Sequence, residues 1–171
     1  MIYLDNAAST RILPEVIQEL VKSCEEYYGN PSSIHSAGQK AKKLLENSRE
    51  VIAGLFGAEG KEIIFTSGGA EGNNLVIKGA AEAYAYKGKH IITTDIEHPT
   101  VLNTLLDLEE KGYEITYLHT DKNGLINVEE LKDSLRQDTI LVSVMSSNNE
   151  TGVIQPIEEI GKIAKENNII F

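Results

Sequence analysis

The sequence predicts an α/β fold in which a mainly parallel sheet is flanked by helices. Short β-branched runs bounded by glycine and polar residues alternate with segments of helical periodicity. Such strand–helix–strand repetition implies right-handed crossovers and therefore parallel strands. The chain has 171 residues, of which 41% are hydrophobic and 25% charged, which is enough for one domain with a core.

Runs rich in isoleucine, valine and threonine predict the strands. Such runs are typical of strands that are buried on both faces of a sheet. They lie at residues 62–66, 90–94, 114–118, 139–143 and 168–171.

Residues that share one face at spacings of three and four predict the helices. In the second helical segment this face holds Ala41, Leu44, Leu45, Ser48, Val51, Ile52 and Leu55. The helical segments lie at residues 16–28, 41–55, 75–86, 101–110, 128–135 and 157–166.

Charge and composition argue against several partners. A net charge of −10 does not suit nucleic acid or anionic membranes, which attract basic patches. No apolar run is long enough to span a bilayer, and residues 1–5 lack the pattern of a signal peptide. The single cysteine, Cys24, can form neither an internal disulfide nor a metal cluster, so we expect a helix residue without a catalytic role. The expected compartment is the reducing cytoplasm.

Candidate ligand-binding loops follow the predicted strands, because open α/β sheets bind ligands beyond the carboxyl ends of their strands. In residues 66–74, the pair Gly68-Gly69 permits a sharp turn, and the next helix begins with N–H groups that can hold a phosphate. A tight strand-to-helix turn needs glycine for purely structural reasons too, and that alternative stays open.

The loop at residues 95–100 carries His98, which can transfer protons or stack on a ring. Its alternative is a plain surface histidine, which is also what we expect of His35, His90 and His119. In residues 146–152, the amides of Asn148 and Asn149 can bind a ligand oxygen or simply shape a turn. Residues 5–10 and 28–33 are expected to flank the site.

Taken in order, these motifs resemble the cysteine desulfurases of the NifS/IscS type, which are class V, fold type I enzymes that use pyridoxal 5′-phosphate (PLP). The resemblance runs from Tyr3 to Phe171. The motifs that carry it are Tyr3-Leu4-Asp5-Asn6-Ala7-Ala8, Gly29-Asn30-Pro31-Ser32-Ser33 with His35, Phe65-Thr66-Ser67-Gly68-Gly69, Glu97-His98 and Asn148-Asn149-Glu150-Thr151-Gly152.

The resemblance implies the front part of the large PLP-binding domain of that fold type. Residues 1–15 would form an amino-terminal segment with a loop at the site entrance, and residues 16–171 an incomplete large domain. Gly69 and Ala70 would bind the PLP phosphate, His98 would stack on the ring and move protons, and Asn149 would contact the phenolic oxygen. The resemblance implies no metal.

Three departures from the family pattern affect this expectation. Ala70 replaces the usual threonine, so one hydrogen bond to phosphate, worth roughly 1.5–3 kcal/mol, is expected to be lost. Ser146-Ser147 replaces the usual histidine and small residue before the asparagine pair. The strand carrying the aspartate for the pyridine nitrogen would begin where Phe171 ends. The lysine that binds PLP, the nucleophilic cysteine and the small carboxy-terminal domain would follow it, so the chain as given is expected to be inactive.

For the parent protein, the resemblance implies conversion of L-cysteine to L-alanine. The sulfur would pass as a persulfide to an acceptor protein, such as an iron–sulfur scaffold, or toward tRNA thiolation. It also implies a homodimer, with no direct nucleic-acid or membrane partner. The alternatives are a selenocysteine lyase, another class V lyase or aminotransferase, and a non-catalytic dimerisation or binding module of the same fold.

Overall fold

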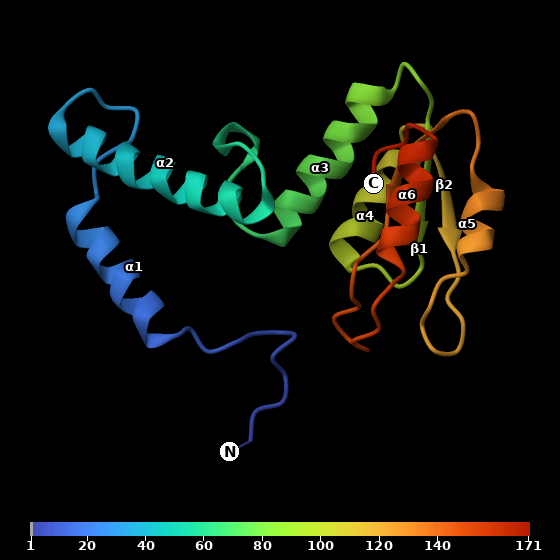
Figure 1. The fold of residues 1–171 in the computed structure, drawn as a ribbon, viewed down its shortest axis with the longest axis horizontal. Coiled ribbons are helices and arrows are strands. Elements are labelled where there is room, and N and C mark those ends of the chain that lie inside the picture. The colour runs from blue at the N-terminus through green and yellow to red at the C-terminus, as the bar shows by residue number, and fades with distance from the viewer. Residues whose placement is uncertain (1) are drawn as a thin grey trace. The chain divides into compact units, whose positions relative to one another are not determined.

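The computed structural model describes residues 2–171. The chain forms two compact units. The amino-terminal unit ends at Phe65, and the carboxy-terminal unit spans Thr66–Phe171. Figure 1 shows the elements of each unit in chain order.

The amino-terminal unit consists of helices and extended segments. It contains α1 (Pro14–Glu26), α2 (Ser36–Phe56) and the short 3-10 helix η1 (Gly60–Glu62). Pro14 opens α1, where its missing N–H costs nothing. The Nδ1 atom of His35 accepts the N–H of Gly38 and caps the start of α2. Gly57, which follows the last helical residue, has a left-handed φ of 64°.

The carboxy-terminal unit is the α/β part. Its elements are α3 (Gly69–Tyr84), β1 (His90–Thr94), α4 (Pro99–Glu109), β2 (Glu114–Leu118), α5 (Val128–Ser134), β3 (Thr139–Ser143) and α6 (Ile157–Glu166). The strands form one sheet in the order β2-β1-β3, and both pairings are parallel. The predicted fold class, a mainly parallel sheet flanked by helices, is confirmed.

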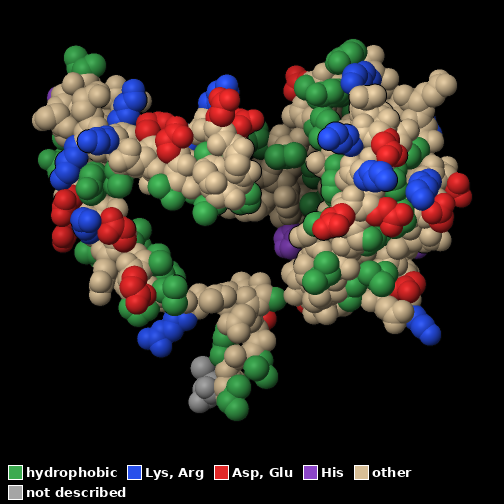
Figure 2. Space-filling model, in the orientation of Figure 1, with side chains coloured by type: hydrophobic (Ala, Val, Ile, Leu, Met, Phe, Trp, Pro, Cys, Tyr) green, Lys and Arg blue, Asp and Glu red, His purple; other side chains and the backbone are tan. Residues whose placement is uncertain are grey.

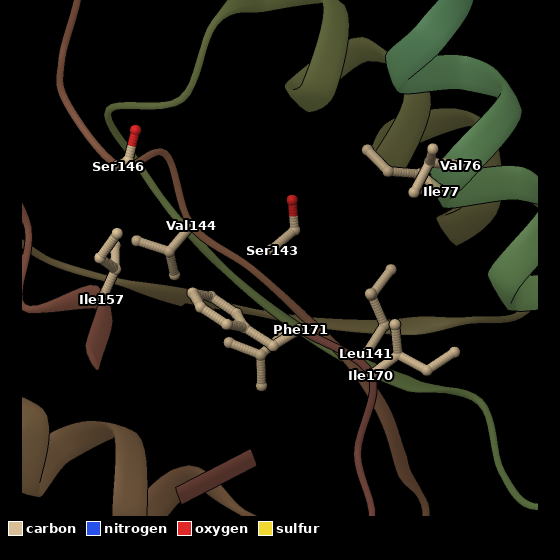
Figure 3. A pocket seen from close by; sticks show the side chains of 10 residues that line it. Val76, Ile77, Leu141, Ser143, Val144, Ser146, Ile157, Ile170 and Phe171 are labelled. Carbon is tan, nitrogen blue, oxygen red and sulfur yellow. The ribbon is translucent and has the colours of Figure 1, made fainter. Parts of the chain in front are cut away.

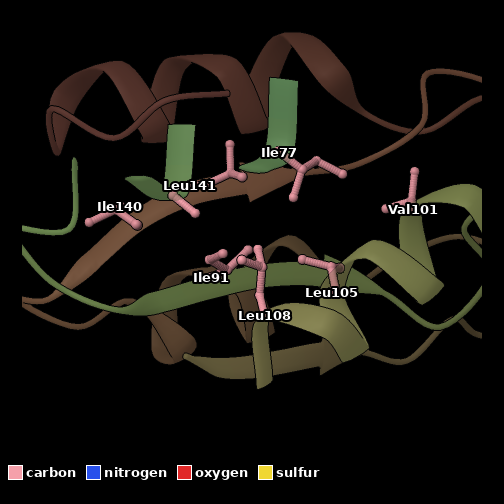
Figure 4. Close-up of a cluster of buried hydrophobic side chains, with 8 residues drawn as sticks. Ile77, Ile91, Val101, Leu105, Leu108, Ile140 and Leu141 are labelled. Carbon is pink, nitrogen blue, oxygen red and sulfur yellow. The ribbon is translucent and has the colours of Figure 1, made fainter. Parts of the chain in front are cut away.

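Two apolar clusters fill the two faces of this sheet. Ile91 belongs to the first cluster and Ile92 to the second, because successive residues of a strand point to opposite faces. In the first cluster Ile91, Leu105 and Leu108 lie close to Ile77 and Leu141, between the sheet and helices α3 and α4 (Figure 4). The second cluster also contains Leu118, Ile126, Leu131, Val142, Ile160 and Ile163.

The strand predicted at residues 62–66 does not form. Gly60–Glu62 is a 3-10 turn, Ile63 is extended, and residues 63–65 have no ladder partner among residues 2–171. An extended run becomes a strand only when a neighbour accepts its hydrogen bonds, and here Ile64 remains 68% exposed. At the other end of the chain, Ile170 makes a parallel bridge to Leu141.

His90 is not the surface residue that the sequence predicts. It is fully buried on the central strand, with Nδ1 2.7 Å from Thr139 Oγ1 and Nε2 2.8 Å from Thr116 Oγ1. The ring therefore links β1 to β3 and β2. Burial, followed by the charge of Arg136, lowers the pKa of His90 below its ordinary value, so the ring is neutral at neutral pH.

Charges of both signs are interspersed on the face seen in Figure 2. Ion pairs such as Lys78–Asp107, 2.7 Å apart, join neighbouring helices. Among the described residues, no helix is both long and apolar enough to cross a membrane.

Candidate functional site

The first candidate element is the start of α3. Gly68 is its N-cap and has no side chain to cap the helix, and the first backbone hydrogen bond runs from Gly72 N–H to Gly68 O at 3.0 Å. Within residues 2–171 the N–H groups of Gly69 and Ala70 have no acceptor. A Cβ built on Gly68 or Gly69 would meet nothing within 4 Å. The loop thus presents backbone donors and a positive helix end to open space.

Glu71 is hydrogen-bonded to the loop that precedes α3. Its Oε2 atom accepts the N–H of Ser67 at 2.6 Å, and this hydrogen bond holds the pKa of the carboxyl below its ordinary value. The carboxylate is therefore ionised near neutral pH and bound to the loop that precedes the helix. The donors of Gly69 and Ala70 are left to other acceptors.

His98 caps the next helix along the chain. Its Nδ1 atom accepts the N–H of Thr100 at 3.1 Å and lies 2.8 Å from Thr100 Oγ1. Pro99 occupies the first helical position of α4. The ring is exposed, and within residues 2–171 hydrogen bonds reach only Nδ1, so the Nε2 edge is open to a ligand.

A side-chain hydrogen bond joins the α3 loop to the His98 loop. Asn73 Nδ2 donates to Thr100 Oγ1 at 2.8 Å, across a sequence separation of 27 residues. Asn73 lies in the first turns of α3 and Thr100 at the start of α4. The phosphate-binding candidate and the ring-stacking candidate therefore lie at neighbouring helix N-termini.

The two asparagines after β3 differ in burial and in role. Asn148 is buried, and its Oδ1 accepts the N–H groups of Glu150 and Thr151, both at 2.9 Å. Its Nδ2 donates to Ile96 O at 3.1 Å. Asn149 is exposed, with Nδ2 3.0 Å from Glu150 Oε1. Because Asn148 shapes the turn, Asn149 is the amide that remains accessible to a ligand.

Glu97 connects the same loops, a role that its place in the Glu97-His98 motif did not reveal. Its Oε1 accepts the hydroxyl of Thr94 at 3.0 Å and the N–H of Met145 at 2.7 Å. Burial raises the pKa of this carboxyl above its ordinary value. With the bond from Asn148 to Ile96, Glu97 braces the loop of His98 against the segment after β3. In the sequence Glu97 was marked only as part of the Glu97-His98 motif, directly before His98 at a strand end.

The structure thus brings together the loops of all four predicted site residues: Gly69, Ala70, His98 and Asn149. Asn73 and Thr100 link the first loop to the second, and Glu97 and Asn148 link the second to the third. Residues 5–10 and 28–33 belong to the amino-terminal unit. Their predicted place beside the site stays a prediction.

An apolar hollow of about 400 Å³ in the carboxy-terminal unit is not this site. Figure 3 shows Val76 and Ile77 of α3 on one side and Leu141, Ile170 and Phe171 on the other. None of the predicted site residues lines it, and its lining contains no titratable side chain.

The remaining histidines and acidic residues suggest no metal centre. Nδ1 of His119 lies 2.8 Å from Asp95 Oδ2, and this hydrogen bond raises the pKa of the exposed imidazole. Within residues 2–171 no group of three or more His, Cys, Asp or Glu side chains is arranged to hold a metal ion. Cys24 is exposed on α1.

Comparison with known proteins identifies the family. The model of the family described as aminotransferase class-V matches residues 2–171. The chain belongs to this family. Among curated class-V relatives, it is 51% identical over 170 residues to a cysteine desulfurase IscS from Dictyoglomus turgidum, covering 99% of this chain and 43% of that protein. It is 50% identical over 171 residues to a protein of the same name from Neisseria meningitidis, covering 99% and 42%.

Solved structures of class-V relatives agree with this placement. One described as a NifS-like protein matches with a TM-score of 0.93 and 41% identity, over 98% of this chain and 46% of that chain. Another, described as SspA in complex with cysteine, matches with a TM-score of 0.92 and 40% identity, over 98% and 48%. The chain therefore spans less than half the length of the relatives it matches.

Proposed function

We propose that this chain acts within a PLP-dependent cysteine desulfurase, where it binds the phosphate and one ring face of the cofactor. The observation that carries the proposal is the hydrogen-bonded convergence of the α3 N-terminus, His98 and the Asn149 loop. Its support in sequence is about 50% identity to proteins named cysteine desulfurase along the whole chain.

The residues present fit PLP. The open space over Gly68 and Gly69, together with the N–H donors of Gly69 and Ala70, suits a phosphate group. The exposed imidazole of His98 offers a flat face for a pyridine ring, and the accessible amide of Asn149 can donate to its phenolic oxygen.

Bound PLP would supply the electron sink for breaking bonds to the substrate's α-carbon and sulfur. The protein groups described above would bind and orient. Gly69 and Ala70 would hold the phosphate, and His98 would exchange a proton at Nε2, the nitrogen that its cap interaction leaves open. Ala70 offers no hydroxyl, so its contribution would come from the backbone alone.

The overall reaction would convert L-cysteine to L-alanine while a cysteine thiolate accepts the sulfur as a persulfide. No lysine in this chain stands in the family's Ser-x-His-Lys context, and Cys24 lies on a helix of the amino-terminal unit. We assign the covalent lysine and the persulfide cysteine to the share of the relatives that this chain does not cover. On the same resemblance we propose a cytoplasmic homodimer and a sulfur-acceptor protein for iron–sulfur clusters or tRNA thiolation.

Titration of the 171-residue chain with PLP, followed by absorbance and fluorescence, tests the phosphate site. Ala70→Thr should tighten binding by about tenfold or more, because it adds a hydroxyl donor to an anionic ligand. Val76→Thr is the matched control, since it adds a hydroxyl to an exposed position of the same helix. Equal affinities in the two variants would contradict the assigned phosphate site.

The intact mass of the protein in its source cell tests the enzymatic proposal. A mass near twice that of this chain should accompany sulfide release from L-cysteine. A mass matching 171 residues would contradict the proposed activity and favour a non-catalytic binding module.

A further inference from the structure

We propose that Asn73 and Thr100 form a positioning relay that fixes the tautomer of His98, with the neutral ring's proton on Nε2. The inference deepens the proposed function, because it names the nitrogen that would face a ligand. It concerns hydrogen bonds within the carboxy-terminal unit, which are present without a cofactor.

The backbone N–H of Thr100 determines which nitrogen of His98 accepts a hydrogen bond. The N–H of Thr100 points at Nδ1 of His98 over 3.1 Å. An amide N–H can only donate, so Nδ1 must offer its lone pair and the ring proton must sit on Nε2.

The side chains of Asn73 and Thr100 direct a second donor to the same nitrogen. Asn73 Nδ2 donates to the oxygen of Thr100, 2.8 Å away, so the hydroxyl proton of Thr100 is directed to the other neighbour of that oxygen. That neighbour is Nδ1 of His98, at 2.8 Å. Nδ1 therefore receives two donors, and a proton on Nδ1 would face both of them.

The start of α4 holds the relay in place. Thr104 Oγ1 donates to the carbonyl of Thr100 at 2.7 Å, and Pro99 restricts the backbone between His98 and Thr100. Nε2 is thus the nitrogen of His98 at which a proton can be exchanged with a ligand. Asn73 and Thr100 act through His98 and are positioning residues rather than catalytic ones.

The test is ¹⁵N NMR of the histidine side chains in the labelled 171-residue chain, at a pH about two units above the ordinary histidine pKa. The ¹⁵N shifts of the two ring nitrogens distinguish the tautomers, and a His98→Gln spectrum assigns the resonances. His98 should have its proton on Nε2. His119 is a control in the same spectra, with the opposite tautomer expected. The Asp95 carboxylate facing Nδ1 of His119 should hold the ring proton on that atom.

Two variants test the relay itself. Thr100→Val removes the hydroxyl with little change in shape, and Asn73→Asp places an acceptor where the donor stood. Each should reduce the ratio of the Nε2-protonated to the Nδ1-protonated tautomer of His98 by about fivefold, the equivalent of one hydrogen bond. Each should also shift the Nδ1 resonance. Thr100→Ser should restore the wild-type spectrum.

A wild-type proton on Nδ1, or spectra unchanged in both Thr100→Val and Asn73→Asp, would overturn the proposal. A change in Thr100→Val alone would overturn the role of Asn73. Because the spectra need no cofactor, a failed relay is distinguishable from failed PLP binding, which would contradict the proposed function instead.

Discussion

The two units bury their apolar residues to very different extents. In the carboxy-terminal unit Ile91, Leu105 and Ile160 are fully buried within two clusters that cover both faces of the sheet. In the amino-terminal unit no residue of α1 is buried, and Leu20 remains 59% exposed. Both regions show clear helical periodicity in sequence.

The difference shows what periodicity reports. A repeat of three and four marks the side of a helix that is apolar, but it does not say which element will cover that side. The sheet supplies the cover in the carboxy-terminal unit. We therefore expect stability to be concentrated there, which the following changes test.

The largest expected effect is the loss of a core side chain. Leu105→Ala should lower the free energy of unfolding by about 2–5 kcal/mol, because it leaves a cavity in the first cluster. Leu20→Ala, the same change at an exposed position, should stay within about 0.5 kcal/mol. Urea denaturation followed by circular dichroism measures both values. Similar losses for the two variants would show that α1 is covered in solution.

A smaller effect is expected where glycine allows the backbone to approach closely. A Cβ at Gly88 would overlap the carbonyl of Asp138, just before β3, so Gly88→Ala should cost about 1–3 kcal/mol. Gly54, within α2 of the amino-terminal unit, has nothing within 4 Å of such a Cβ. Gly54→Ala should therefore stabilise its helix by about 0.5–1 kcal/mol. In thermal unfolding, Gly88→Ala should lower the melting temperature and Gly54→Ala should raise it. A change in the same direction for both variants would contradict the comparison.

The smallest expected effect is a pH dependence that originates in the sheet. The pKa of His90 is lowered by burial and by Arg136, so the unfolded chain binds a proton more readily than the native one. The stability contributed by neutral His90 is fully present above the ordinary histidine pKa of about 6.5 and is lost as pH falls below it. His90→Gln should remove this loss in denaturation curves recorded across that range.

His119 provides the opposite sign for the same measurement. Its pKa is raised by Asp95, so its contribution is present below the ordinary pKa and is lost as pH rises through the raised value. His119→Gln should therefore steepen the loss of stability on acidification. If the His90→Gln variant still loses as much stability on acidification as the wild type, the titrating group lies elsewhere.

The sequence pattern predicted those helices and strands whose residues themselves favour that structure. The strands His90–Thr94, Glu114–Leu118 and Thr139–Ser143 and the helix Ile157–Glu166 form with the predicted bounds. The strand at residues 62–66 does not, because a strand depends on a partner that composition cannot reveal. Helix α3 begins at Gly69 rather than Leu75, since its first turn includes glycines that carry little helical signal.

The same distinction applies to the candidate site. The loops of His98 and Asn149 could be found because each follows a predicted strand that forms, and the loop of Gly69 because a glycine pair precedes a helix. The linking roles of Asn73 and Glu97 could not be found, because their partners Thr100 and Met145 are 27 and 48 residues away. Contacts of this kind depend on which loops the sheet order brings together.

The brace formed by Glu97 and Asn148 affects the thermodynamics of ligand binding. Its hydrogen bonds to Met145 and Ile96 are made within the protein, and they order two loops before any ligand arrives. A ligand that binds there loses its own motional freedom but restricts little further motion of the chain. Binding should therefore show a modest entropic penalty and an association rate that is not limited by loop closure.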